Sequence, residues 1–460
     1  LDDCTLSGNT GRYGVGAYLN GGGVLNRCVL TAHTMGYKGA GAYLNGGGTL
    51  NNCLVYGNSV TGKGRGGGVC LDGGTLNNCT ITANSSASTS GGLYIYDGTL
   101  NNCIAWGNTG DGNDISAIGG TIHNSCARGG LIDGVDGCTT HDPLFVDATS
   151  DDYRLRSISP CVDAGDNTLA PITPPPLDLA GSKRIAFSTV DMGAYECTYR
   201  VVPADGPAAG GNSVTLTADA LGSGSDITGV TVAGMSATLS DQGTNWVQFI
   251  TAASPDGSQA VIDDVVVDST GSGASTFANA YTYNPTGTVI SLPVSAGAWT
   301  GGYQIVISGT NLCDGTLGDI SDITIGGLSV TSIDRVSGST QIVVTVAQST
   351  AGLADVLVRS TRFGDSALLL GFTYEQTEQT ISFPAIADQV ATNTLTLSAT
   401  ASSGLPVSFA IESGPGTLSG GTELSFTGAG PVSIVASQAG DVNWSAALDV
   451  TNTFNVTKAD

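Results

Sequence analysis

The sequence predicts an all-β protein, with a right-handed parallel β-helix followed by three Ig-like β-sandwich domains. A cysteine recurs at spacings of 24, 25, 26 and 24 residues, at Cys4, Cys28, Cys53, Cys79 and Cys103. Most of these cysteines close a common phrase, such as GTLNNC at 48–53 and 74–79. Beyond residue 197 the repeat gives way to alternating strands rich in Val, Thr and Ser. A phrase repeated at a near-constant period indicates one structural unit stacked on copies of itself.

The repeating unit is built from strands rather than helices. Between the cysteines lie glycine runs such as 21–23 and 46–48, with Asn and Thr and few helix-forming residues. Short alternating segments such as AYL at 42–44 are bounded by turn residues. A coil of three short strands and three turns at this period is typical of a parallel β-helix. Leucine-rich repeats share the period, but their spaced leucines and helical return leg are missing. We therefore predict a β-helix with an irregular C-terminal cap over residues 1–197.

Two columns of like residues are expected to run along this β-helix. The cysteine column is expected to hold stacked free thiols, because small apolar thiols pack well inside a coil and parallel Cβ vectors suit disulfides poorly. Five residues beyond each cysteine comes Asn9, Asn58, Asn84 or Asn108, with His33 in the same column. These side chains are expected to hydrogen-bond from coil to coil, at positions where Asn tolerates left-handed turns. The better disulfide candidates lie off the column, at Cys126, Cys138, Cys161 and Cys197.

A third column is expected to face outward. Alternation along the repeated strand GAYLN, at 16–20 and 41–45, puts Ala and Leu inside and Tyr outside. Tyr18, Tyr43 and Tyr94 then line one face, with Cys70 in the same column, and are candidates for stacking on sugar rings. Stacking of like residues on each other, which stiffens the fold, is the alternative interpretation.

The segment that follows the regular coils carries a series of specific motifs. They read DPLFV at 142–146, SPCVDAGD at 159–166, DLAG at 178–181 and DMGAYE at 191–196. This series resembles the end of bacterial surface β-helix proteins of the choice-of-anchor Q type, in which the segment closes the solenoid. A closed end is also expected on physical grounds, since an open β-helix end exposes unpaired strand edges.

Three domains are predicted after the β-helix, at 198–285, 286–375 and 376–460. The first opens with GPAAGG at 206–211 and closes with YTY at 281–283, and the second closes with FTY at 372–374. Both resemble IPT/TIG domains. The third resembles the repeated Ig-like modules of bacterial surface proteins. The resemblance implies scaffold modules without chemistry of their own, and a row of sandwiches suits a rigid stalk.

No catalytic group is predicted, and the chain is expected not to be an enzyme. The three histidines have no nucleophile or base beside them, and the acidic pair Asp2-Asp3 aligns with Asn pairs of the repeat. No cofactor is expected. Structural calcium is the metal that the acidic turns suit best, and its candidate ligands are Asp111, Asn113, Asp114, Asp163 and Asp166. Solvated acidic turns are the alternative, because neither segment has the spacing of a known calcium loop.

Composition narrows the choice of partners. The formal net charge is −24, which disfavours nucleic acid and direct insertion into an anionic membrane. Few lysines and abundant Gly, Ser and Thr favour an extracellular protein of the bacterial cell surface. The main functional prediction is a structural or adhesive protein that self-associates end to end into a fibre or surface layer. The alternative is a β-helix protein that binds extracellular polysaccharide, with lyase-like activity included. The chain opens inside a repeat phrase, so further coils are expected to precede Leu1.

Overall fold

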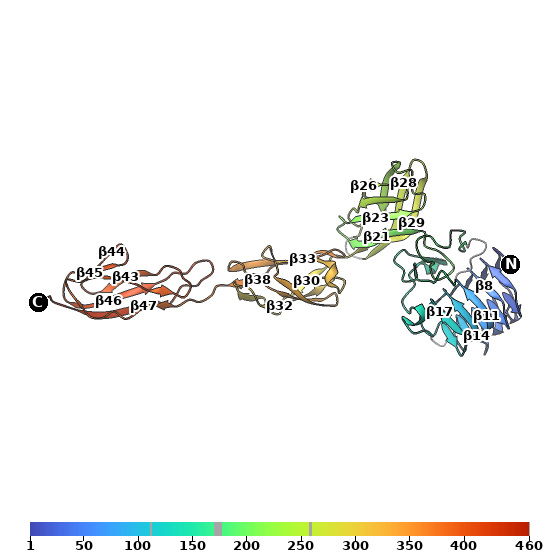
Figure 1. Ribbon diagram of the computed structural model, residues 1–460, viewed down its shortest axis with the longest axis horizontal. Coiled ribbons are helices and arrows are strands. Elements are labelled where there is room, and N and C mark those ends of the chain that lie inside the picture. Colours follow the sequence, from blue (N-terminus) through green and yellow to red (C-terminus); the bar gives the residue numbers. More distant parts are fainter. Residues whose placement is uncertain (111–112, 170–176, 257–259, 460) are drawn as a thin grey trace. The chain divides into compact units, whose positions relative to one another are not determined.

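A computed structural model describes residues 1–110, 113–169, 177–256 and 260–459. The described chain is almost entirely β-structure, as the sequence predicts, and it divides into two compact units, Leu1–Tyr283 and Asn284–Asp460. The first unit contains a parallel β-helix, its cap and one β-sandwich, and the second contains two further sandwiches (Figure 1). Within the described ranges, no helix combines the length and the apolar character that a membrane span requires.

The β-helix is formed by three parallel sheets, which the chain visits in turn (Figure 1). One sheet has six strands: β1 (Thr5–Ser7), β5 (Val29–Thr31), β9 (Leu54–Tyr56), β12 (Thr80–Thr82), β15 (Ile104–Trp106) and β18 (Cys126–Ala127). The next has four strands: β2 (Thr10–Tyr13), β6 (Thr34–Lys38), β10 (Ser59–Val60) and β13 (Ser85–Ser86). The third has eight strands: β3 (Ala17–Asn20), β4 (Val24–Asn26), β7 (Ala42–Asn45), β8 (Thr49–Asn51), β11 (Val69–Asn77), β14 (Leu93–Asn101), β16 (Ile115–Ala117) and β17 (Thr121–His123).

The sequence repeat sets the register of these sheets. Tyr18 pairs with Tyr43, and Leu25 with Leu50, so that equivalent residues of successive phrases lie one above another. Inside the coils the apolar residues of the six- and eight-stranded sheets form one continuous core that includes Cys28, Cys53, Cys79 and Cys103, whereas Met35 and Val60 of the four-stranded sheet belong to a smaller cluster of their own. Burying these residues drives the stacking, because a single coil cannot cover its own apolar face.

A left-handed residue precedes each member of the Asn column. These residues have φ between 50° and 72° and are Gly8, Ala32, Gly57, Ala83 and Gly107. The column asparagines themselves are not left-handed. The left-handed conformation expected at Asn9, Asn58, Asn84 and Asn108 is therefore found at the residue that precedes each of them. Two of the five left-handed residues are alanines, and a left-handed residue with a Cβ costs about 1–2 kcal/mol.

The cap covers the β-helix with little regular structure. It contains the hairpin β19 (Phe145–Asp147) and β20 (Asp152–Leu155) and the short 3₁₀ turns η1 (Val135–Gly137) and η2 (Ala148–Ser150). Its far end folds back onto coils much earlier in the chain: the Ala194 N–H donates to Thr80 Oγ1 at 2.9 Å, and the Gly193 N–H donates to the Asn102 carbonyl at 2.8 Å. The cap is therefore hydrogen-bonded directly to the coils of the β-helix and does not merely come after them in the sequence.

The first and second sandwiches have the same topology, with one four-stranded and one five-stranded sheet each. The first comprises β21 (Tyr199–Val202), β22 (Asp205–Pro207), β23 (Ser213–Ala218), β24 (Ile227–Val232), β25 (Met235–Ser236), β26 (Thr238–Gln242), β27 (Trp246–Ile250), β28 (Val261–Ser269) and β29 (Gly273–Asn284). The second comprises β30 (Thr288–Ser291), β31 (Ala296–Ala298), β32 (Gln304–Thr310), the 3₁₀ turn η3 (Leu317–Asp319), β33 (Ile320–Ile325), β34 (Leu328–Ser329), β35 (Ser332–Ser337), β36 (Gln341–Thr345), β37 (Gly352–Ser360) and β38 (Gly364–Glu375).

The third sandwich has shorter strands and a smaller core. Its strands are β39 (Ile381–Ser382), β40 (Gln389–Val390), β41 (Thr394–Thr396), β42 (Thr400–Ala401), β43 (Ser408–Ser413), β44 (Gly416–Ser419), β45 (Glu423–Phe426), β46 (Gly430–Ser437) and β47 (Val450–Thr457). Within the second unit, the Ala351 N–H donates to Asn443 Oδ1 at 3.0 Å, and the rings of Trp299 and Trp444 lie edge to face, 6.2 Å apart. These contacts join the second and third sandwiches.

Candidate functional site

The tyrosine column forms on the eight-stranded sheet, but most of it is covered. Tyr18, Tyr43, Cys70 and Tyr94 occupy equivalent positions on β3, β7, β11 and β14, and the rings of Tyr18 and Tyr43 stack 5.3 Å apart. Tyr18 is 49% exposed, whereas Tyr43 is 6% and Tyr94 8% exposed. The expectation of an open aromatic face is therefore wrong for Tyr43 and Tyr94.

Two cations, Lys38 at the end of β6 and Arg65 bridged to it on the next coil, cover those rings. Lys38 Nζ lies 5.1 Å from the ring centroid of Tyr43 and 4.5 Å from that of Tyr96. The Arg65 guanidinium lies 4.8 Å from the ring centroid of Tyr94, and its Nη1 donates a short hydrogen bond to the Tyr96 hydroxyl. A cation over an aromatic face gains electrostatic attraction of about 0.5–2 kcal/mol, so these contacts hold the cations over the sheet.

Beside this cover the surface opens into a polar pocket, which we call the Lys–Tyr pocket. Its volume is about 150 Å³, and its lining residues are Tyr37, Lys38, Lys63, Arg65 and Tyr96. Lys38 and Arg65 occupy equivalent positions on neighbouring coils, where they form a parallel bridge. Tyr37 is 46% exposed, and its ring lies edge to face with that of Tyr13, 5.3 Å away. Along the sequence the three cations look like isolated turn residues, and only the coil register brings them together.

The Asn column forms a continuous hydrogen-bonded ladder inside the coils. The backbone N–H of Asn58 donates to Asn84 Oδ1 and that of Asn84 donates to Asn108 Oδ1, both at 3.0 Å. Each side-chain amide also donates to a carbonyl of the preceding coil, as Asn84 Nδ2 does to Val55 at 2.8 Å. The ladder therefore satisfies buried backbone groups at the turns, where no sheet partner is present.

His33 performs the same task with an imidazole. Its Nδ1 accepts from the Asn9 N–H at 3.1 Å, and its own N–H donates to Asn58 Oδ1 at 3.0 Å. An accepting Nδ1 requires the neutral ring with the proton on Nε2, and that nitrogen is buried without a partner among the described residues. Burial lowers the pKa of His33 below its ordinary value of 6.5.

Asp114 extends the Asn ladder rather than a calcium site. Its Oδ1 accepts from the Asn108 N–H at 2.7 Å and from Asn108 Nδ2 at 3.0 Å, as the next Asn of the column would. Arg128 lies 3.4 Å from its Oδ2. The side chain is fully buried, and this burial raises the pKa of Asp114. Asp111 lies outside the described residues, and the residues that are described place no carboxylate cluster around Asn113.

Local contacts also account for the second calcium candidate. Asp163 pairs closely with Arg200, and its Oδ1 accepts from the Thr189 N–H at 3.2 Å. Asp166 closes a turn on Thr168, whose N–H and hydroxyl both donate to its Oδ1, at 2.8 and 2.7 Å. Among the described residues, no group of three or more His, Cys, Asp and Glu side chains could hold a metal ion.

All eleven cysteines are free thiols. The expectation of disulfides at Cys126, Cys138, Cys161 and Cys197 is therefore wrong; Cys126 and Cys161 share an apolar cluster instead. In the column, the Cys28 N–H donates to Cys53 Sγ at 3.4 Å and the Cys79 N–H donates to Cys103 Sγ at 3.3 Å, so these two thiols accept from the coil that precedes them. Burial raises the pKa of Cys53 and Cys79 well above the ordinary value, which keeps these thiols protonated and unreactive.

The cap is organised around a buried guanidinium. Arg184 is 1% exposed, and its Nη2 donates to the carbonyls of Asp191 and Gly193, both at 2.6 Å. Its Nε lies 4.0 Å from Glu196 Oε2, and burial raises the pKa of both Glu196 and Asp191. Each oxygen of these two carboxyls receives a backbone N–H, as from Cys197 to Asp191 Oδ2 at 2.6 Å. The motifs at 178–181 and 191–196 thus serve to close the cap.

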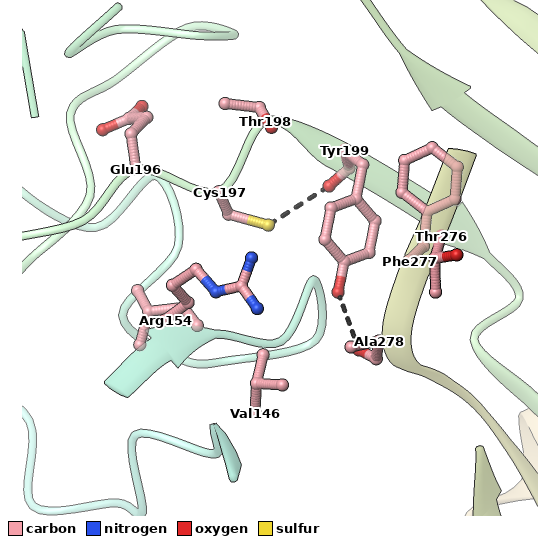
Figure 2. Close-up of a pocket in the computed structure, with 10 residues that line it drawn as sticks. Val146, Arg154, Glu196, Cys197, Thr198, Tyr199, Thr276, Phe277 and Ala278 are labelled. Carbon is pink, nitrogen blue, oxygen red and sulfur yellow. Dashed lines mark hydrogen bonds between the residues drawn. The ribbon is translucent and has the colours of Figure 1, made fainter. Parts of the chain in front are cut away.

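A second cavity, of about 160 Å³, lies between the cap and the first sandwich (Figure 2). Figure 2 shows Arg154, Cys197 and Tyr199 around it, with the Cys197 thiol donating to the Tyr199 carbonyl at 3.3 Å. Burial raises the pKa of Cys197 to about 12, so the thiol is no nucleophile at neutral pH. Next to the cavity, Arg156 donates to the Asn279 carbonyl at 2.9 Å. This cavity is therefore part of a structural joint.

Comparison with known families decides the nature of two sandwiches. The family described as "IPT/TIG domain" matches residues 197–283 and 285–374. These two segments are IPT/TIG domains. Comparison with curated proteins gives no match.

Solved structures resemble the chain in fold alone. The extracellular region of Plexin A4, domains 1 to 8, is 20% identical over 38% of this chain and 18% of its own length, with a TM-score of 0.27. The surface glycan-binding protein PbSGBP-B from Prevotella bryantii is 17% identical over 35% of this chain and 36% of its own, with a TM-score of 0.17. A Bacteroides ovatus SGBP-B in complex with a mixed-linkage heptasaccharide is 16% identical over 38% and 47%, with a TM-score of 0.16.

At these TM-scores the likeness carries no argument about ligand or partner. The chain spans about a fifth of the length of the Plexin A4 structures that it matches, 18% of one and 22% of the other.

Proposed function

We propose that the chain is an extracellular protein of the bacterial cell surface whose β-helix binds carbohydrate. The IPT/TIG domains and the third sandwich then act as spacers. The observation that supports carbohydrate binding is the Lys–Tyr pocket, in which the half-exposed Tyr37 lies beside fixed hydrogen-bond donors on a sheet face. Sugar sites combine these two elements, because a ring face covers the apolar side of a pyranose and polar groups bind its hydroxyls.

The proposal is binding without catalysis. Lys38 Nζ lies 3.4 Å from the Tyr43 hydroxyl and 3.7 Å from Asp72, and Arg65 donates to Tyr96, so both cations are held by neighbours. A general base would need a neutral, mobile amine. Burial opposes the charged form of Lys38, but the hydrogen bond to Tyr43 and the neighbouring charges outweigh it and raise the pKa of this amine. Lyase-like activity therefore stays a hypothesis from the sequence.

Two further sequence-based predictions are hypotheses. Assembly end to end into a fibre or surface layer is a hypothesis that rests on the repeat, and membership in the choice-of-anchor Q type rests on the motifs between 142 and 196. The closed, buried arrangement around Arg184 supports the second hypothesis, since such motifs are expected to form a terminal cap.

Affinity electrophoresis of the full chain through gels that contain single polysaccharides tests the proposal. We expect retardation in at least one gel, and we expect Tyr37→Ala to reduce it at least fivefold because this half-exposed residue lines the pocket. Leu369→Ala, which removes an exposed apolar side chain of the second sandwich, is the control and should leave migration unchanged. A chain that no neutral or acidic polysaccharide retards would overturn the proposal.

A further inference from the structure

We propose that the Lys–Tyr pocket selects acidic sugars, binding the carboxylate or sulfate of an acidic polysaccharide among Lys38, Lys63 and Arg65. The inference deepens the proposed function, on which it rests, by naming the ligand class of the same site. Positive charge is concentrated in this pocket, although the chain as a whole is strongly acidic.

The chain has 15 Lys and Arg residues against 39 Asp and Glu residues, yet three of the 15 line this one pocket. At physiological ionic strength, charges separated by more than about 8 Å are largely screened. A bound anion inside the pocket therefore experiences these three cations more strongly than the acidic surface beyond. The field at this site is opposite in sign to that expected from the net charge.

The ring contacts of Lys38 and Arg65 hold these two cations in place, but they do not neutralise their charge. Lys38 and Arg65 occupy equivalent positions on adjacent coils, and like charges directly opposite each other on neighbouring strands are destabilising. Asp72 compensates one of them in part, at 3.7 Å from Lys38 Nζ. Lys63 makes no ion pair with any residue in the described ranges, and its side chain is exposed. The pocket thus keeps positive charge that a bound anion would neutralise.

The geometry fits a sugar-borne acid. Arg65 is fixed against Tyr96, which leaves a preorganised planar donor of the kind that pairs with carboxylate or sulfate oxygens. Tyr37 lines the pocket beside these donors and is 46% exposed, with its ring edge to face with Tyr13, so a pyranose that carries the acid group can stack on it. A volume of about 150 Å³ equals that of about five water molecules, sufficient for an acid group with part of its ring.

Nucleic acid is the competing polyanion. Its binding proteins neutralise several successive phosphates along a basic stripe, whereas Lys38, Lys63 and Arg65 are confined to one pocket. The structure therefore favours an acidic sugar, and an oligonucleotide serves as a test ligand.

Calorimetric titration of the full chain at low and physiological salt tests the inference. The ligands are oligogalacturonate, its neutral methyl ester, a carrageenan oligomer of the same length and single-stranded oligothymidylate. We expect the carboxylated or the sulfated oligomer to bind at least tenfold more tightly than the ester, and more weakly at higher salt. Preference between carboxylate and sulfate identifies the acid group.

Lys63→Met is the decisive variant, since its side chain is exposed and no described residue pairs with it. We expect a tenfold loss of affinity for the acidic oligomer, whereas the matched control Lys183→Met, an exposed lysine of the cap, should change it less than twofold. Equal affinity for ester and acid, an unaffected Lys63→Met protein, or equally tight oligothymidylate would overturn the inference. If neutral sugars bind and Tyr37→Ala abolishes their binding, the proposed carbohydrate-binding function is retained. If no sugar binds, both the proposed function and the preference for acidic sugars are refuted.

Discussion

Removing one rung of the buried Asn ladder should destabilise the β-helix far more than removing an Asn from its surface. Asn84 Oδ1 accepts from the Asn58 N–H and from Asn58 Nδ2, at 3.0 and 2.9 Å, and Asn84 Nδ2 donates to the Val55 carbonyl. Asn84→Ala leaves the Asn58 N–H buried without an acceptor, which costs about 1–3 kcal/mol, and it also loses the bond to Val55, about 1 kcal/mol. The expected total is about 3 kcal/mol.

Asn77→Ala is the matched control on the same coil. Asn77 donates to Asn51 Oδ1 at 2.9 Å and accepts from Asn101 Nδ2 at 3.0 Å, but it is only half-buried, so water replaces much of what is lost. We expect a loss of about 0.5–1 kcal/mol.

Hydrogen exchange measured by mass spectrometry resolves this difference in the full chain, because coils open as local units. Peptides that cover 54–60 and 80–86 should exchange about 30-fold faster in Asn84→Ala than in Asn77→Ala, the ratio that corresponds to about 2 kcal/mol. Protection factors that agree within threefold in the two variants would refute the contribution of the ladder to stability.

Three further predictions concern His33, Ala83 and Arg184. Since burial lowers the pKa of His33 below 6.5, its contribution to the free energy of unfolding is complete above about pH 6.5 and is lost as the pH falls. His33→Asn should therefore reduce the loss of melting temperature between neutral and acidic pH, and an equal loss in both proteins would contradict the role of this imidazole. Ala83 is exposed with φ 52°, and Ala83→Gly should raise the free energy of unfolding in urea by about 0.5–1 kcal/mol, because the left-handed penalty exceeds the entropy that Gly loses. Ala87→Gly, at an exposed position with ordinary φ, should give no such increase, and a destabilised Ala83→Gly protein would argue against strain at this residue. Arg184→Met leaves buried carboxyl groups without their cation and should lower the stability of the cap by about 3–5 kcal/mol. The loss should appear as faster hydrogen exchange over 178–197, and unchanged exchange there would show that the guanidinium does not hold the cap together.

The repeat made the β-helix predictable because its period fixes both the register and the inward face. Alternation in AYL at 42–44 correctly placed Ala42 and Leu44 in the core. The same alternation could not show that Tyr43 is covered, because the cover comes from Lys38, at the end of a strand of another sheet. Side chains that reach across from a neighbouring sheet cannot be predicted from the pattern along a single strand.

The acidic turns show a second limit. Asp114 looks like part of a calcium loop in the sequence DGND at 111–114, yet it occupies the Asn ladder, because the last coil returns to the column after six residues instead of about 24. A changed coil length hides the equivalence of Asp114 and Asn108. The contacts of the cap could not be predicted from the sequence either, since the Ala194 N–H donates to Thr80, 114 residues earlier in the chain.

The most direct test of the account is the location of the binding site. Hydrogen exchange of the full chain should be measured with and without saturating oligogalacturonate, over peptides that cover the β-helix and all three sandwiches. The account predicts protection confined to peptides that contain Tyr37–Lys38, Lys63–Arg65 and Tyr96, with unchanged exchange in residues 284–459. Protection in the sandwiches, with none around the Lys–Tyr pocket, would contradict it.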